Sequence, residues 1–509
     1  MVIKLFSVAI TGIDAEVVEV ELDAGPGQIA YKIIGLPDNA VRESMDRVLS
    51  ALKNGGYDYP RGRVVVNLAP AELRKEGAFY DLPIAIAMAM ATGGVVSEKA
   101  GDYLIVGELS LNGELRPVRG ALATAITAKQ RGFKGVIVPV ANAAEAGVLA
   151  DEVEVVAVEN LSQTIGFLTG DLPAPALPEF PIPDDNALPD NLCYSDVRGQ
   201  ESVKRALEVA AAGGHNLLML GPPGSGKTMC AQRLPTILPE LTFAESLEVT
   251  KIYSVAGELR PGQGLLRRRP FRSPHHSASI PGLIGGGTTP HPGEISLAHH
   301  GVLFLDEAPE FPRPLLETLR QPLEDGCVTI SRAAGSCRYP ASIMLVLAMN
   351  MCPCGKTGTR QVCHCHPLAI ERYVGRLSAP LLDRIDIHVE APLVKYDELR
   401  GQRTGETSAA IRERVTRARA IQQQRFGPRP DAVNARMRPA DLEKFCALDE
   451  ECESLLKTAV TEIGLSARAC GRVLKVARTI ADLAQSERIT EDHLSEAIQY
   501  RVLDRKKTY

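Results

Sequence analysis

The segment Gly221-Pro-Pro-Gly-Ser-Gly-Lys-Thr228 fits the pattern G-x-x-x-x-G-K-[ST] and follows the apolar run Leu217–Leu220. Helix-like sequence starts at Met229, so the segment connects a strand to a helix. In such a phosphate-binding loop the glycines let backbone N–H groups face the phosphates, and the lysine reaches the β- and γ-phosphate oxygens. The threonine hydroxyl is a ligand for Mg²⁺. The residues expected to bind ATP and Mg²⁺ are therefore Gly221, Pro222, Pro223, Gly224, Ser225, Gly226, Lys227 and Thr228.

Two further strand ends carry polar residues that suit this chemistry. The apolar run Val302–Leu305 ends in Asp306 and Glu307. We expect Asp306 to hold Mg²⁺ through water and Glu307 to polarise the attacking water as a general base. A third apolar run, Ile343–Met349, ends at Asn350, whose amide can orient that water or touch the γ-phosphate. The alternative for Asn350 is that it only caps a turn.

Composition divides the chain at one proline-rich segment. Residues 172–191 contain six prolines, which predicts an extended linker. Before it, residues 1–171 mix alternating strands with alanine-rich helices. After it, residues 192–395 alternate strands with helices, as in a parallel sheet covered on both faces. Residues 396–509 are helical and rich in charge. The predicted fold is multidomain α/β: an α+β N-terminal domain, a parallel-sheet α/β nucleotide-binding domain and a helical C-terminal lid.

The α+β prediction for the N-terminal domain depends on four segments. Residues 17–22 and 63–67 alternate apolar and polar side chains, which predicts half-buried strands. Residues 82–91 and 121–130 are alanine-rich and predict helices.

Charge and hydropathy exclude some classes of protein. Lys and Arg total 57 against 62 Asp and Glu, a net charge of −5, so bulk charge does not indicate nucleic acid and any such surface must be local. No apolar run reaches the roughly 18 residues of a membrane span. The N-terminus alternates like a strand and meets an acidic residue at Asp14, unlike a signal peptide. We therefore expect a cytoplasmic protein that has no membrane partner.

Four of the eleven cysteines lie in one short segment, 352–365. Their spacing is C-x-C-x8-C-x-C, and four thiolates on a glycine-bearing loop can close a tetrahedral Zn²⁺ site. His364 and His366 are possible substitute ligands. The alternative is a set of unmetallated or redox-paired thiols, although such close free cysteines are prone to oxidation. The predicted structural zinc ligands are Cys352, Cys354, Cys363 and Cys365.

The order of these motifs resembles a known family. Phosphate-binding loop, Asp-Glu, strand-end Asn and then Leu381-Leu-Asp-Arg-Ile-Asp386 follow the order of an AAA+ ATPase module. The stretch Arg269-Pro-Phe-Arg-Ser-Pro-His-His276, the cysteine cluster and the N-terminal domain make the chain similar to the Mg-chelatase-like ComM (YifB) family, which is linked with natural transformation. The resemblance covers essentially the whole chain.

The resemblance implies roles for residues distant from the phosphate-binding loop. Arg384 matches an arginine finger, which stabilises charge on the γ-phosphate of the neighbouring subunit. As a sequence feature alone, Leu-Asp-Arg-Ile-Asp could equally form an ion pair at a helix end. Arg468 resembles the lid arginine that reads nucleotide state, with Arg472 as the alternative. By the same resemblance the protein is a homo-hexameric ring motor that acts on DNA and promotes branch migration in recombination. The alternative function is a chelatase-like ATPase that remodels a protein partner for metal insertion.

The resemblance also suggests where DNA could bind. In Mg-chelatase-type modules the region that corresponds to residues 265–287 faces the ring pore, and here it carries Arg267, Arg268, Arg269 and Arg272. Arginines on loops suit phosphate contacts that do not depend on base sequence. A hairpin over residues 326–338, with Arg332 and Arg338, is a second candidate. Alternatively, these arginines are solvated or bind the neighbouring subunit.

The N-terminal domain resembles the proteolytic domain of Lon, in which a serine and a lysine form a catalytic dyad. The segment that should contain the serine, Gly77–Pro83, has none, and the segment that should contain the lysine, Arg119–Thr124, has none either. A nucleophile and its base are both required. The domain is therefore expected to be non-proteolytic.

Overall fold

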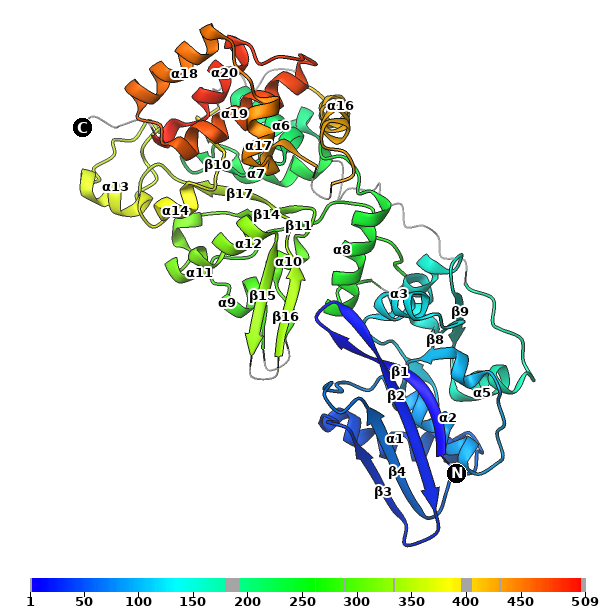
Figure 1. Ribbon diagram of the computed structural model, residues 1–509. Coiled ribbons are helices and arrows are strands. Elements are labelled where there is room, and N and C mark those ends of the chain that lie inside the picture. The colour runs from blue at the N-terminus through cyan, green and yellow to red at the C-terminus, as the bar shows by residue number, and fades with distance from the viewer. Residues whose placement is uncertain are drawn as a thin grey trace. The chain divides into compact units, whose positions relative to one another are not determined.

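The computed structural model describes residues 2–178, 192–260, 262–287, 290–332, 335–394, 405–429 and 432–504. The chain forms two compact units, each with its own apolar core (Figure 1). The N-terminal unit consists of Met1–Asp184 together with the separate segment Phe243–Leu266. The second unit consists of Asp185–Thr242 and Arg267–Tyr509.

A seven-stranded mixed sheet forms the centre of the N-terminal unit, in the order β3-β4-β2-β1-β5-β8-β9. The alternation of apolar residues predicted two of these strands correctly, since Val18, Val20 and Leu22 are all buried on one face of β2. The strands are β1 Val2–Thr11, β2 Asp14–Gly25, β3 Ala30–Ile34, β4 Arg63–Ala69, β5 Tyr103–Ile105, β8 Gly135–Pro139 and β9 Glu154–Val158; a small hairpin joins β6 Glu108–Leu109 to β7 Leu115–Arg116.

Helices cover both faces of this sheet. One core contains side chains of α1 (Asn39–Asn54), α2 (Asp81–Ala91) and α5 (Leu161–Thr169). The core on the other face contains side chains of α3 (Ala121–Arg131) and α4 (Ala143–Ala146). The two helices predicted from alanine-rich sequence, α2 and α3, are therefore confirmed.

Helix α8 (Phe243–Ala256) belongs to the N-terminal unit, although sequence analysis placed it within residues 192–395. It packs against α3, and the Ser254 hydroxyl donates a hydrogen bond to the buried carboxylate of Glu145. That carboxylate also accepts the Leu122 backbone N–H at 2.7 Å, at the first turn of α3. Burial raises the pKa of Glu145, and the hydrogen bonds from Ser254 and Leu122 oppose that rise. Helix α8 is thus attached to the N-terminal unit by a buried hydrogen bond to Glu145 as well as by its packing against α3.

The second unit contains a five-stranded sheet in which every pair is parallel, in the order β11-β14-β17-β10-β18. All residues of β10, β14 and β17 are buried, as expected for a parallel sheet with both faces covered. The predicted parallel α/β sheet is confirmed. The strands are β10 Leu217–Leu220, β11 Phe271–Arg272, β14 Val302–Leu305, β17 Met344–Met349 and β18 Ile387–Glu390.

The helices of the second unit fall into two groups. Those interspersed with the strands are α6 Glu201–Gly213, α7 Lys227–Arg233, α9 Ile280–Ile284, α10 Glu294–Leu297, α11 Arg313–Thr318, α12 Arg320–Asp325, α13 Pro367–Val374 and α14 Ala379–Leu382. The C-terminal group is α16 Ser408–Phe426, α17 Pro439–Phe445, α18 Glu450–Ile463, α19 Ala467–Leu483 and α20 Glu491–Gln499. In Figure 1 the C-terminal group gathers beside α6, against which α16 and α19 pack. The helical C-terminal region is confirmed.

Two hairpins complete the second unit. The longer one joins β15 (Cys327–Arg332) to β16 (Gly335–Pro340), and Figure 1 shows it extending away from the sheet. It occupies the segment that sequence analysis singled out around residues 326–338. The shorter one joins β12 (Gly285–Gly286) to β13 (His291–Pro292).

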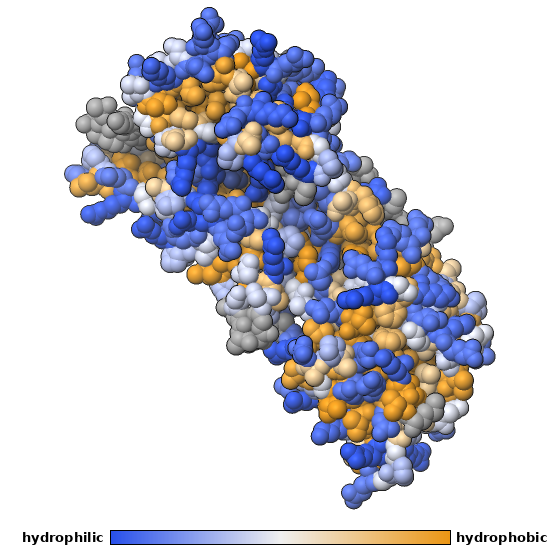
Figure 2. Space-filling model, in the orientation of Figure 1, coloured by the Kyte–Doolittle hydropathy of each residue, from blue (hydrophilic) through white to orange (hydrophobic). Residues whose placement is uncertain are grey.

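The proline-rich linker predicted at 172–191 lies partly outside the described residues. Its described part, up to Pro178, has neither helix nor strand. Among the helices that the structure describes, none has the length and apolar character needed to cross a bilayer. On the face that Figure 2 shows, hydrophilic and hydrophobic residues are interspersed.

Candidate nucleotide-binding site

The phosphate-binding loop joins the buried end of β10 to the first turn of α7, as its sequence predicts. Gly224 and Gly226 have φ angles of +77° and +91°, which residues with a side chain rarely adopt. At Gly221 a Cβ atom would lie 2.2 Å from the carbonyl oxygen of Ala391. Glycine is therefore required at these positions by backbone geometry and by close packing.

Lys227 points back into the loop that precedes it. Its Nζ donates hydrogen bonds to the carbonyl oxygens of Gly221 and Pro222, at 2.8 and 2.9 Å, and lies 3.4 Å from Oδ1 of Asn350. Burial lowers the pKa of Lys227, while the charges of Asp306 and Glu307 act in the opposite direction. The loop thus holds the ammonium group among oxygen atoms, where a phosphate oxygen could replace a carbonyl.

The Mg²⁺ ligands expected from sequence lie next to each other. The Thr228 hydroxyl donates to Oδ2 of Asp306 at 2.5 Å, and Oδ1 of Asp306 accepts the backbone N–H of Glu307 at 2.9 Å. A hydroxyl and a carboxylate that converge beside a phosphate-binding loop are the donors that Mg²⁺ takes in nucleotide hydrolases. Thr228 and Asp306 would therefore hold a Mg²⁺ ion, which would supply positive charge beside the phosphates.

Glu307 is placed where a water molecule can reach it. Its backbone has a φ of +50°, and its side chain is 58% exposed. Nδ1 of His276 lies 3.9 Å from a carboxylate oxygen of Glu307. Sequence analysis gave His276 no role, because nothing in the sequence indicates that the loop after β11 reaches the end of β14.

The sheet order explains why these residues meet. Asp306 follows β14, Asn350 follows β17 and the phosphate-binding loop follows β10, and β17 pairs with both other strands. Because all three strands are parallel, their carboxyl ends share one edge of the sheet. Ligands of open α/β sheets bind at this edge.

Arg384 and Arg468 lie at the other edge. Arg384 precedes β18, and Ile387 of β18 pairs with Leu217, the first residue of β10. The phosphate-binding loop follows Leu220, so the length of a strand, roughly 10 Å, separates the two ends. Arg468 is 78% exposed and lies 3.7 Å from Asp383, the residue before Arg384. Both arginines are therefore positioned away from the phosphate-binding loop of their own chain.

Arg472, the alternative to Arg468, has a buried partner. It pairs with Asp386, which also lies 3.1 Å from Nδ1 of the buried His215. Burial opposes ionisation of Asp386, but the hydrogen bond from His215 and the charge of Arg472 outweigh it and hold the pKa of this carboxyl well below its usual range. Nε2 of His215 in turn lies 2.8 Å from the Thr479 hydroxyl in α19. Arg472 therefore attaches α19 to the sheet, and Arg468 is the exposed arginine.

The four clustered cysteines converge. The Sγ atoms of Cys352, Cys354 and Cys363 are 3.4 to 3.7 Å apart, and with Cys365 all four lie within 4.8 Å of one another. Four sulfurs at about 2.3 Å from a zinc ion would be separated by about 3.8 Å, so the set fits tetrahedral coordination.

The cysteine loop also packs on the phosphate-binding loop. A Cβ atom on Gly355 would lie 2.9 Å from the Pro223 ring, and one on Gly358 would lie 3.4 Å from the Pro222 ring. A change in the conformation of the cysteine loop would therefore displace Pro222 and Pro223 of the phosphate-binding loop.

The four arginines expected to contact DNA differ in their surroundings. Arg269 donates to the carbonyl oxygens of Pro239 and His300 at 2.7 and 2.9 Å, and Arg272 forms a two-bond ion pair with Glu294. These two guanidinium groups thus hold the protein's own loops. The side chains of Arg267 and Arg268 are exposed and half-exposed, and within the described ranges neither has an ion pair.

The two segments that correspond, by the predicted resemblance to Lon, to its dyad contribute to the apolar core. Phe79 packs against the cores on both faces of the sheet, and Ala123 in α3 is buried. The serine and lysine expected in Lon are absent from both segments. That this domain is non-proteolytic stays a prediction.

Comparison with known proteins agrees with this geometry. The family model described as "Magnesium chelatase, subunit ChlI" matches residues 193–399, a second ChlI model matches 18–142, and a ChlI C-terminal model matches 405–501. Competence protein ComM of Haemophilus influenzae is 44% identical, over 98% of this chain and 97% of its own. The uncharacterized protein YifB of Escherichia coli is 46% identical, over 98% and 96%. The magnesium-chelatase 38 kDa subunit of Rhodobacter capsulatus is 24% identical, over 59% and 84%.

The fold and the site define a Mg-chelatase-like AAA+ ATPase. Within that class, near full-length identity above 40% places the chain in the ComM/YifB family. The resemblance seen in the sequence is thereby confirmed. The Lon-like character of the N-terminal domain stays a prediction.

The roles of Lys227 and Glu307 can be separated by substitution. We expect Lys227→Ala to weaken ATP binding about tenfold or more, because a charge-assisted contact to phosphate is lost in the ground state. Glu307→Gln should bind ATP normally but hydrolyse it about 10²- to 10⁴-fold more slowly, since a general base acts only as hydrolysis proceeds. Equilibrium binding and steady-state ATPase rates measure the two effects. A Glu307→Gln protein with normal turnover would remove Glu307 from the mechanism.

Proposed function

We propose that this protein is an ATP-driven ring motor that moves along DNA and promotes branch migration during recombination linked with natural transformation. The observation that supports it most is that Arg384 lies at the edge of the sheet opposite to the phosphate-binding loop. An arginine finger in that position cannot serve its own chain, so it would complete the site of a neighbour. The name of the Haemophilus relative, a competence protein, supports the link with transformation.

Each chain would contribute to two sites. Lys227, Thr228, Asp306 and Glu307 bind ATP and orient the attacking water on one side. Mg²⁺, when bound, would neutralise charge between the β- and γ-phosphates. Arg384 and Arg468 of the adjacent subunit would approach the γ-phosphate from the other side. Repetition of this contact closes a ring, which we propose to be a homo-hexamer that acts in the cytoplasm.

Mixing two inactive variants tests the ring. Arg384→Ala protein should bind ATP but lose about 10³-fold or more in hydrolysis. When it is mixed with Lys227→Ala protein, one kind of interface pairs an intact phosphate-binding loop with an intact finger, so some ATPase activity should return. Steady-state ATPase over a range of mixing ratios measures this. Mixtures that stay as inactive as the separate variants would exclude action between subunits.

We further propose that Cys352, Cys354, Cys363 and Cys365 hold one structural Zn²⁺ ion. The short distances among the four sulfur atoms support this proposal. Because the cysteine loop packs on Pro222 and Pro223, an ion that holds the cysteine loop would also stabilise the phosphate-binding loop. The ion would fix the wall of the phosphate-binding loop rather than take part in hydrolysis.

Elemental analysis of anaerobically purified protein should find one zinc per chain. The double variant Cys352→Ser/Cys363→Ser should lose the metal, because zinc affinity depends on a complete ligand set. ATP affinity should fall with it, since the loop against Pro222 and Pro223 loosens. Cys470→Ser, in α19, is a matched control that should retain both. A metal-free wild-type protein would disprove the proposal.

For DNA, we propose contacts by Arg267 and Arg268 and by Arg338 on the exposed side of β16. Arg269 and Arg272 are left out of this set because of their internal partners. Arg332, the other hairpin candidate, has a side chain outside the described residues. The N-terminal domain would be a non-proteolytic module for assembly.

The triple variant Arg267→Ala/Arg268→Ala/Arg338→Ala should bind DNA more weakly, whatever its sequence. The slope of log affinity against log salt should decrease by up to about three, nearly one per lost phosphate contact. Arg417→Ala, which removes a surface arginine from α16, is the control. Fluorescence anisotropy and unwinding of labelled branched DNA measure binding and activity. If wild-type protein neither binds DNA nor unwinds it, the chelatase-like alternative, supported by the R. capsulatus relative, takes first place.

A further inference from the structure

The side chain of Arg384 is largely buried in this chain. Its guanidinium pairs with the carboxylate of Glu324, at the C-terminal end of α12, and its side chain is only 12% exposed. Within the described part of the chain, its buried Nε has no hydrogen-bond partner. Glu324 is 59% exposed. The finger is therefore held by an anion of its own subunit, and that anion lies at the surface.

A cavity of about 350 Å³ lies beside this pair, and it is lined by more cations than anions. Asp383 and Asp386 each have an arginine partner, Arg468 and Arg472. Within the described residues, two further cations, Arg436 and Lys475, donate to carbonyl oxygens, Leu323 at 3.4 Å and Ala435 at 3.0 Å. An anion that enters this cavity would therefore find excess positive charge, and Glu324 is the carboxylate that Arg384 already holds.

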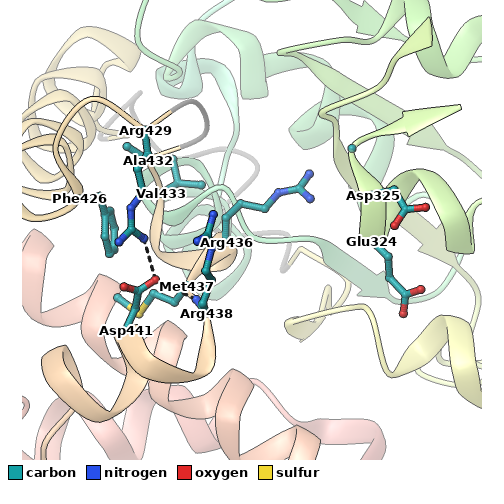
Figure 3. Close-up of a pocket in the computed structure, with 11 residues that line it drawn as sticks. Glu324, Asp325, Phe426, Arg429, Ala432, Val433, Arg436, Met437, Arg438 and Asp441 are labelled. Atoms are coloured by element: carbon teal, nitrogen blue, oxygen red, sulfur yellow. Dashed lines mark hydrogen bonds and ion pairs between the residues drawn. The ribbon is translucent and has the colours of Figure 1, made fainter. Parts of the chain in front are cut away.

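Glu324 also borders a second cavity, which Figure 3 shows. In that view Arg436 extends from the segment before α17 toward the side of the cavity that Glu324 and Asp325 form. Glu324 thus pairs with Arg384, while Arg436 extends toward the same side of the cavity. A displacement of α12, which carries Glu324, would move this carboxylate relative to Arg384.

The β15–β16 hairpin starts three residues after Glu324. Asp325 is the last residue of α12 and Gly326 joins the helix to β15; the Gly326 carbonyl accepts the backbone N–H of Ala341 at 2.8 Å, which closes the base of the hairpin. Cys327 pairs with Pro340 in the same ladder. Only two residues of backbone therefore separate Glu324 from the hairpin.

We propose that Glu324 is a positioning residue that holds Arg384 in a resting position and releases it to the neighbour's triphosphate when the β15–β16 hairpin is displaced by its ligand. This rests on the proposed role of Arg384 as the finger. The carboxylate of Glu324 competes for Arg384 with the charge that develops on the neighbour's γ-phosphate during transfer. Because the two anions compete, the resting ATPase rate is kept below the rate that the assembled site can reach.

The test is Glu324→Gln. We expect basal kcat to rise about two- to fivefold, the range that corresponds to the release of one partly exposed ion pair. KM for ATP should be unchanged, because a finger acts in the transition state. Stimulation of the ATPase by branched DNA should shrink by a similar factor, since the finger is already released. Glu324→Asp, which keeps a carboxylate, should restore behaviour close to wild type.

The controls separate this mechanism from a structural role. Removal of a carboxylate from the C-terminal end of a helix does not weaken the helix dipole interaction, so the thermal midpoint should not fall. Glu413→Gln, which breaks an exposed pair with Arg417 in α16, should leave kcat unchanged. Glu324→Gln/Arg384→Ala should be as inactive as Arg384→Ala, because the gain passes through the finger.

The outcomes distinguish two failures. If Arg384→Ala hydrolyses ATP normally, the proposed finger is wrong and the role of Glu324 falls with it. If Arg384→Ala is inactive but Glu324→Gln has wild-type or lower kcat, the finger stands and Glu324 has no restraining role.

Discussion

The parallel pairing of β10 with β17 on one side and with β18 on the other is the constraint on which the rest of the second unit depends. Leu217 pairs with Val346 and with Ile387, so the three strands run in register and in one direction. Their carboxyl ends carry the phosphate-binding loop and Asn350, and the amino end of β18 carries Arg384. Groups that bind nucleotide and the group that would stabilise charge on it are thus separated within one chain. Under the proposed function, a single subunit would hold two half-sites.

Buried charge connects the helical C-terminal region to this sheet. Asp386, His215 and Thr479 form a chain of contacts from the amino end of β18 into α19. Asp482 continues it, because its carboxylate accepts hydrogen bonds from Arg425 and Asn434. Buried ionic groups cost desolvation free energy, and removing one partner leaves an uncompensated charge. Such a network favours one arrangement of the helices over others, and here that arrangement sets where Arg468 lies.

The N-terminal unit depends on a segment that is distant in sequence. After α7 the chain leaves the second unit, forms α8 in the N-terminal unit and returns to the second unit before β11, the strand that carries Arg272. Its Ser254 donates to Glu145, and Glu145 caps the first turn of α3. The chain therefore passes between the two units three times, near residues 184, 242 and 266. Both ends of the segment that contains α8 therefore connect the N-terminal unit covalently to the unit that holds the nucleotide site.

The sequence by itself was sufficient to predict the strands, helices and loop whose structure depends on residues close to one another along the chain. Continuous apolar runs predicted β10, β14 and β17, alanine-rich periodicity predicted α2 and α3, and glycine spacing predicted the phosphate-binding loop, because each is determined by neighbours along the chain. The tertiary structure alone decided which cations have partners. Arg269 and Arg272 resemble Arg267 and Arg268 in sequence, yet only the first two reach internal acceptors. The pairing of Glu324 with Arg384, the place of His276 beside Glu307 and the membership of α8 in the N-terminal unit have the same origin. Such contacts join residues 22 to 109 positions apart, and local periodicity carries no information about them.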